Sequence, residues 1–196
     1  VVPQGTYYEN INFLGKNIVL TSTDPSNPSV VNNTIIDGSS AGPVVTFDGT
    51  EISDCYLIGF TITNGSGLNG EGGGVYGNGT NATIRKNNIT VNTVSQSGAG
   101  IYNCNGIIHG NDINNNTATN DCGGGLYLCH GDIRENIISN NTSSRGGGLA
   151  FCNGNIDDND ITTNFASASI GEVGGGGLYQ CSGTITNNTI SNNDAN

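Results

Sequence analysis

The 196-residue sequence has no methionine and no tryptophan, and only 11% of its residues are charged. Five basic residues stand against sixteen acidic ones, which gives a formal net charge of −11. A chain so poor in lysine and arginine repels phosphate backbones and anionic membrane surfaces, so nucleic acid is not an expected partner. Metal cations, neutral sugars and cationic surfaces stay open as partners. The simpler alternative is that the acidity only keeps the chain soluble.

Long apolar runs are also missing. No window holds the ~18 or more apolar residues that a membrane-spanning helix requires, so we expect no membrane span. No charged and apolar leader precedes Val1, and the absence of an initiator methionine suggests a processed or excised piece of a larger precursor. Helical stripes of apolar residues are absent, which favours an all-β fold in a single domain over residues 1–196.

What the sequence does contain is a repeat. Five copies of one unit fill residues 72–196, and their glycine-rich openings lie 23 to 29 residues apart. The openings begin at Gly72, Gly98, Gly123, Gly146 and Gly175. Short apolar clusters between Gly and Asn predict strands of about three to five residues, three to each copy. We therefore expect each copy to form one rung of a parallel β-helix, a β-solenoid stabilised by stacking its rungs.

Two isoleucine columns and two asparagine columns run through these copies. The isoleucines are Ile84, Ile108, Ile133, Ile156 and Ile185, then Ile89, Ile113, Ile138, Ile161 and Ile190, and they should stack inward at the ~4.8 Å strand spacing. Three residues after each comes an asparagine: Asn87, Asn111, Asn136, Asn159 and Asn188 in one column, Asn92, Asn116, Asn141, Asn164 and Asn193 in the other. Asparagine tolerates left-handed backbone and can bond its equivalents on adjacent rungs, which predicts structural ladders at the corners.

Four of the six cysteines also form a column, because Cys104, Cys129, Cys152 and Cys181 are each the sixth residue after an opening glycine, where the first copy has Asn78. In-register parallel side chains give poor disulfide torsions, so we expect a buried thiol stack of small hydrophobic groups. One disulfide using Cys122 stays open, and zinc is a weaker alternative because it needs four converging ligands. Leu126 and Cys129 would face opposite sides of a straight strand, which predicts a bend between them.

Residues 1–71 depart from the repeat but follow the same logic. Short β-type runs occur at residues 10–13, 17–21, 34–37, 44–47 and 56–63, and they predict about three further, irregular rungs, hence about eight in all. Residues 22–29, with Pro25 and Pro28, are expected to form a surface loop. No end cap is evident in the sequence, and uncapped edge strands invite further pairing.

Several segments resemble a known family. Gly5-Thr-Tyr-Tyr-Glu-Asn-Ile-Asn-Phe, Thr34-Ile-Ile-Asp-Gly and Gly59-Phe-Thr-Ile-Thr-Asn-Gly are similar to the opening of pectin-lyase-like right-handed β-helix domains in large secreted bacterial or archaeal proteins. The glycine and asparagine repeats resemble those domains too, and more distantly the repeats of polymorphic outer-membrane proteins. The resemblance implies right-handed coiling and an extracellular or cell-surface location. It does not select an activity, because that superfamily includes lyases, hydrolases, adhesins and stalks.

A charged stripe is the main candidate for chemistry. Repeat alignment places Arg134 between His109 and Asp157, and places Glu135 directly before Asp158 on the next rung. Stacked ~5 Å apart, the Glu135 and Asp158 carboxylates would repel, and calcium is a candidate ligand because it would relieve that repulsion. A solvated carboxylate pair is the alternative. No other cofactor is expected.

The sequence supports a catalytic site less well than it supports a cation site in the charged stripe. Asp157, Asp158 and Asp160 are candidates for the pair of carboxyl groups, ~5 to 9.5 Å apart, that glycoside hydrolases need. His109 and His130 are interpreted as outward rung residues, since neither lies in the Gly-His-Gly segment expected of polygalacturonase-like proteins. We therefore favour a structural or adhesive β-solenoid, with end-to-end self-association into a filament, over an enzyme. A polysaccharide-binding or polysaccharide-cleaving domain, with a glycan partner, is the alternative.

Overall fold

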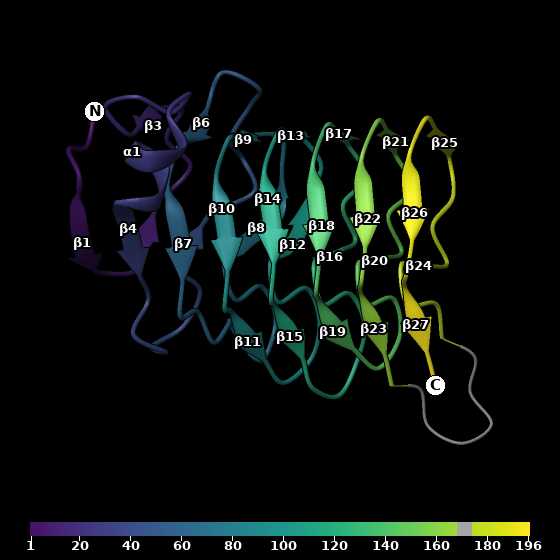
Figure 1. The fold of residues 1–196 in the computed structure, drawn as a ribbon. Coiled ribbons are helices and arrows are strands. Elements are labelled where there is room, and N and C mark those ends of the chain that lie inside the picture. The colour runs from purple at the N-terminus through teal and green to yellow at the C-terminus, as the bar shows by residue number, and fades with distance from the viewer. Residues whose placement is uncertain (168–173) are drawn as a thin grey trace.

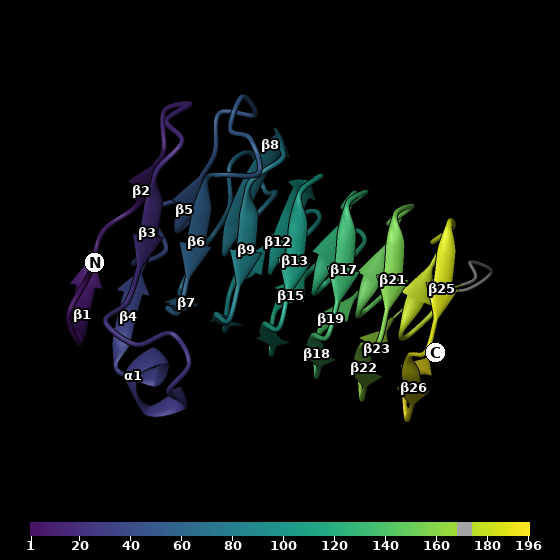
Figure 2. The ribbon, with the colours of Figure 1, turned by 90° about the horizontal axis from the view of Figure 1, so that it is seen from above.

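The computed structural model describes residues 1–167 and 174–196, and it confirms a right-handed parallel β-helix (Figure 1). The chain passes repeatedly through four parallel sheets, so the rungs follow one another along one axis and the two termini lie at opposite ends (Figures 1 and 2). One sheet has eight strands and two others have seven strands each. The solenoid therefore has about seven full turns, where the sequence predicts about eight rungs. No helix in the described part of the chain is long and apolar enough to span a membrane.

The strands are short, as the apolar clusters predict, but each repeat copy contains four strands, one in each sheet, and not the predicted three. Sheet 1 contains β1 (Gly5–Tyr8), β4 (Thr34–Asp37), β7 (Thr61–Thr63), β10 (Asn88–Thr90), β14 (Asp112–Asn114), β18 (Ile137–Ser139), β22 (Asp160–Thr162) and β26 (Thr189–Ser191). Sheet 2 contains β11 (Thr93–Val94), β15 (Thr117–Ala118), β19 (Thr142–Ser143), β23 (Phe165–Ala166) and β27 (Asp194–Ala195).

The other two sheets complete each rung. Sheet 3 contains β2 (Ile11–Asn12), β5 (Val45–Thr46), β8 (Val75–Thr80), β12 (Ile101–Cys104), β16 (Leu126–Tyr127), β20 (Leu149–Ala150) and β24 (Leu178–Tyr179). Sheet 4 contains β3 (Val19–Thr21), β6 (Tyr56–Ile58), β9 (Thr83–Arg85), β13 (Ile107–His109), β17 (Asp132–Arg134), β21 (Asn155–Asp157) and β25 (Thr184–Thr186).

Both isoleucine columns stack in register. Ile108 pairs with Ile84 and Ile133, and Ile133 pairs with Ile156, along sheet 4, while the second column runs in the same way along sheet 1. All isoleucines of the two columns are fully buried except Ile185 and Ile190 in the last rung. Because no single rung could bury these side chains alone, stacking supplies the hydrophobic core.

The asparagines form two continuous ladders. The Oδ1 atom of Asn136 accepts hydrogen bonds from the backbone N–H of Asn111 at 2.9 Å and from its Nδ2 at 3.0 Å. Asn136 in turn donates from Nδ2 to the carbonyl of Ile108 and to Oδ1 of Asn159. The same pattern repeats down both columns, so each buried amide satisfies backbone groups at a corner.

One expectation about these corners is wrong. The left-handed conformation falls on the residue before each ladder asparagine and not on the asparagine itself. In the first column the left-handed residues are Lys86, Gly110, Glu135, Asp158 and Asn187, with φ between 54° and 62°. The asparagine side chain instead points inward, where it replaces the strand pairing that the corner interrupts.

The cysteine column lies in the core at the edge of sheet 3. Cys104, Cys129 and Cys152 are fully buried, Cys181 is partly buried, and all six cysteines are free thiols, so the disulfide left open for Cys122 is not formed. The predicted bend is present, because Leu128 has φ 54° and lets both Leu126 and Cys129 point inward.

Two details differ from the expected frame. The residue opposite Cys104 in the preceding rung is Thr80 and not Asn78, because β8 has a bulge where the register shifts. The predicted loop at residues 22–29 also leads into a short helix, α1 (Pro28–Asn32), that lies beside β4 outside the rungs (Figure 2). Asn27 caps this helix by accepting a hydrogen bond from the N–H of Ser29, and Pro28 suits its first turn.

Candidate functional site

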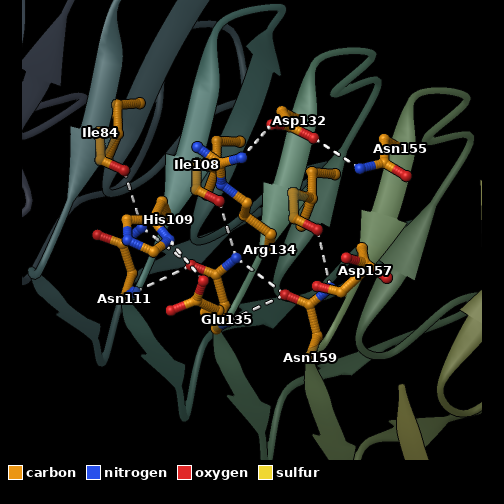
Figure 3. A network of polar contacts seen from close by, with 12 residues as sticks. Ile84, Ile108, His109, Asn111, Asp132, Arg134, Glu135, Asn155, Asp157 and Asn159 are labelled. Atoms are coloured by element: carbon orange, nitrogen blue, oxygen red, sulfur yellow. Dashed lines mark hydrogen bonds and ion pairs between the residues drawn. The ribbon is translucent and has the colours of Figure 1, made fainter. Parts of the chain in front are cut away.

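The charged stripe predicted from the sequence lies on the outer face of sheet 4 (Figure 3). His109 pairs with Arg134, and Arg134 pairs with Asp157, on three adjacent strands. Arg134 forms an ion pair with Asp132 of its own strand at 3.0 Å, and Asp132 accepts a hydrogen bond from Asn155 at 2.8 Å. The charge of Arg134 is therefore neutralised by Asp132 within its own rung. The amide of Asn155 connects Asp132 to the next rung.

The proposed calcium pair occupies the corner beside this stripe. Glu135 and Asp158 are equivalent residues of adjacent rungs, and both have left-handed backbone. Glu135 Oε1 lies 4.0 Å from Nδ1 of His109. Within residues 1–167 and 174–196, no group of three or more His, Cys, Asp or Glu side chains is placed to hold a metal ion. Calcium binding by this pair stays a prediction, in which water would supply most of the ligands.

The three carboxylates considered for hydrolysis do not belong to one sheet. Asp157 ends β21 in sheet 4, and it accepts hydrogen bonds from Thr186 at 2.7 Å and Asn187 at 2.9 Å. Asp160 begins β22 in sheet 1, on the other side of the corner that contains Asp158. Asp157 therefore connects its rung to the next rung through two hydrogen bonds.

A row of aromatic side chains covers the outer face of sheet 3 and was missed by the sequence reasoning. Tyr76, Tyr102, Tyr127, Phe151 and Tyr179 follow one another with ring centroids 5.2 to 5.7 Å apart. Tyrosine follows the glycine-rich opening in four of the five copies, so the repeat already contained this signal. All five side chains are half-buried, which leaves part of each ring at the surface.

A polar cluster borders this aromatic row. Asp121 accepts hydrogen bonds from the Ser97 hydroxyl and the Cys122 thiol, each at 3.0 Å, and pairs with Arg145 at 3.3 Å. The Arg145 guanidinium also lies over the ring of Tyr179, 5.8 Å from its centroid. Burial, reinforced by the neighbouring Asp121 carboxylate, raises the pKa of the Cys122 thiol to about 12, so this thiol is a hydrogen-bond donor and not a nucleophile.

Burial governs the thiols of the cysteine column as well. It raises the pKa of Cys104 and Cys152 well above the usual range. The pKa of Cys181 is lowered, because the Cys152 thiol donates a hydrogen bond to its sulfur. The Cys104 and Cys152 thiols therefore fill the core as neutral groups.

A buried carboxylate continues the same column toward the N-terminus. Glu51 accepts hydrogen bonds from the backbone N–H groups of Gly15, Asp48 and Gly49 and from the Thr80 hydroxyl, at 2.9 to 3.2 Å. Burial alone would raise its pKa, but these hydrogen bonds outweigh it and the pKa is lowered. The ionised carboxylate thus holds three rungs together.

Comparison of the chain with protein-family models, with curated proteins and with solved structures finds no match. The resemblance to pectin-lyase-like domains consequently stays a resemblance of sequence segments. The described geometry establishes the fold, its ladders and its surface rows, and any activity must be argued from those features.

Proposed function

We propose that the protein is a structural or adhesive module of an extracellular or cell-surface protein, a rigid rod whose copies stack end to end. The observation that carries this proposal is the continuation of every column into the last described rung. There Ile185 and Ile190 are 40% and 50% exposed, whereas their equivalents Ile156 and Ile161 in the preceding rung are fully buried. A further rung stacked on this face would bury both side chains.

The ladders support the same proposal. In the interior rungs, the backbone N–H of each ladder asparagine donates to Oδ1 of the asparagine in the next rung, as Asn159 does to Asn188 and Asn164 does to Asn193. Asn188 and Asn193 hold the last positions of the two ladders. Stacking another rung would extend the ladders and pair the edge strands β25, β26 and β27.

The oligomeric state of the 196-residue chain tests this proposal. We expect light scattering after size exclusion to show a molar mass that increases with protein concentration. Electron microscopy should show rods whose length increases with protein concentration as well. The double variant Ile185→Lys/Ile190→Lys should stop growth, because it places charges on the stacking face. The control Ile137→Lys changes an isoleucine that is 49% exposed on the side of the rod, and it should not affect length. A monomer at every concentration would contradict end-to-end stacking.

Polysaccharide binding is the second candidate, and the aromatic row favours it. Partly exposed aromatic rings pack well against the apolar faces of sugars, and the hydroxyl groups nearby offer hydrogen bonds. Burial and a hydrogen bond to Glu71 raise the pKa of Tyr102, so its hydroxyl stays protonated and available for hydrogen bonding. A glycan array compared between the native chain and Tyr127→Ala tests this candidate, and a calcium titration of Glu135→Gln tests the proposed cation.

A further inference from the structure

A cavity of about 380 Å³ lies outside the hydrophobic core, between α1 with its preceding loop and the corner that joins sheets 4 and 1. Its size falls in the range of small-molecule sites, roughly 300 to 1,000 Å³. Pro25, Pro28 and Val31 provide an apolar wall. The facing residues come from two adjacent rungs and are mostly polar: Lys86, Asn87, Asn88, Gly110 and Asp112.

Two opposite charges line this cavity without neutralising each other. The Lys86 ammonium donates a hydrogen bond to the Ser26 hydroxyl at 2.9 Å, and Asp112 accepts one from Asn114 at 2.8 Å. Among the described residues no ion pair joins Lys86 to Asp112 or to any other carboxylate. Both residues are exposed, so a ligand in the cavity can reach both charged groups. An unpaired ammonium and carboxylate that line one cavity are complementary to a ligand that carries a carboxylate and an ammonium.

Gly110 keeps the cavity open at the second rung. It occupies the left-handed corner position that Lys86 fills in the rung before and Glu135 fills in the rung after. A Cβ atom built on Gly110 would have only Cγ of Lys86 within 4 Å, at 4.0 Å, so the space above the backbone is empty. A side chain at this position would project toward the ligand space instead of into the core.

We propose that this cavity binds a small zwitterion of amino-acid or dipeptide size. The ligand carboxylate pairs with Lys86, its ammonium pairs with Asp112, and its apolar part packs against Pro25, Pro28 and Val31. The net charge of −11 repels simple anions, and the Lys86 ammonium repels simple cations. A zwitterion has no net charge, so neither repulsion opposes its binding. This site is independent of end-to-end stacking, because its residues lie on the side of the rod.

Titration with the dipeptide Gly-Leu, followed by saturation-transfer NMR, tests the proposal. We expect saturable binding in the millimolar range or tighter. Forms blocked by N-acetylation or C-amidation should bind at least about tenfold more weakly, because each loses one charge-assisted hydrogen bond. Glucose serves as a neutral ligand of similar size and should give no saturable signal.

Variants locate the binding. Gly110→Asn fills the cavity at a position where Asn is tolerated, since Asn187 holds the same corner position with φ 55°. Gly110→Asn, Lys86→Asn and Asp112→Asn should each lose the dipeptide signal while melting as the native chain does. Asp158→Asn lies in the same corner column away from the cavity and should bind normally. Failure of Gly-Leu to saturate up to about 10 mM, equal binding of blocked forms or glucose, or binding that survives Gly110→Asn would each overturn the proposal.

Discussion

Single residues have left-handed backbone in the corner before each ladder asparagine. In the second ladder these residues are Val91, Asn115, Asn140, Thr163 and Asn192, all with φ between 54° and 56°. A β-branched side chain is unfavourable in this region, and Val91 gains little from packing because it is 52% exposed. We predict that Val91→Asn stabilises the chain by about 1 kcal/mol, measured by urea unfolding.

The matched control for Val91 is Val19→Asn. Val19 is 55% exposed but lies within strand β3, where its backbone is not left-handed. This second substitution should leave stability unchanged or lower it slightly, because asparagine is disfavoured in strands. Equal effects at the two positions would show that polarity, and not backbone strain, determines the change.

The ladder amides are the most sensitive single groups. Asn136→Ala would leave the buried N–H of Asn111 and the carbonyl of Ile108 without their partners. Each unsatisfied group is expected to destabilise by about 1 to 3 kcal/mol, so we predict a loss of about 3 kcal/mol in urea unfolding. Asn155→Ala removes one exposed hydrogen bond to Asp132 and should lower stability by less than about 1 kcal/mol.

Glu51 gives the fold a specific acid sensitivity. Its folded-state pKa is lowered below the unfolded value of about 4.3, so its stabilising effect is complete above that pH and is lost as the pH falls through the folded value. We predict that Glu51→Gln unfolds more easily than the native chain at neutral pH, and that the difference narrows below about pH 4. Urea midpoints measured from pH 7 to pH 3 check this, with the exposed Glu9→Gln as control. A constant difference across that range would contradict it.

At the scale of an element, the glycine-rich openings let neighbouring rungs approach closely. A Cβ on Gly125 would lie 2.6 Å from the carbonyl oxygen of Gly148 in the next rung, and backbone cannot give way there. We predict that Gly125→Ala destabilises by several kcal/mol, more than a typical surface substitution. Gly110→Ala meets open space and only the strain of a left-handed alanine, about 1 kcal/mol, so chemical unfolding should separate the two.

The elements that sequence could predict are those that recur. The isoleucine and asparagine columns repeat at fixed offsets, so their stacking follows from the repeat alone. The short helix α1 spans only five residues and leaves no helical period to detect, although Asn27 and Pro28 are start signals. The contacts of Asp121 were not predicted because the repeat column immediately before the glycine openings contains Ser97, Cys122 and Arg145, whereas Asp121 lies one residue before that column.

At the scale of the whole molecule, the thiols bear on the proposed extracellular location. Unpaired cysteines are uncommon in oxidising compartments. Here Cys104, Cys129 and Cys152 are fully buried, and burial keeps Cys104 and Cys152 protonated, so oxidants would reach them slowly. A buried column of thiols is therefore compatible with a secreted rod, provided that the rungs stay stacked.

Stability of the whole rod depends on contacts between neighbouring rungs, so it should vary along the axis. We predict that, in dilute solution, amides around Ile185 and Ile190 exchange with solvent sooner than those around Ile133 and Ile138, because the last described rung has a neighbour on one side only. Native-state hydrogen exchange measures this gradient. If rods stack end to end, protection of Ile185 and Ile190 must increase with protein concentration while the interior rungs stay constant. A flat gradient at low concentration would show that the rungs open together and not from the end.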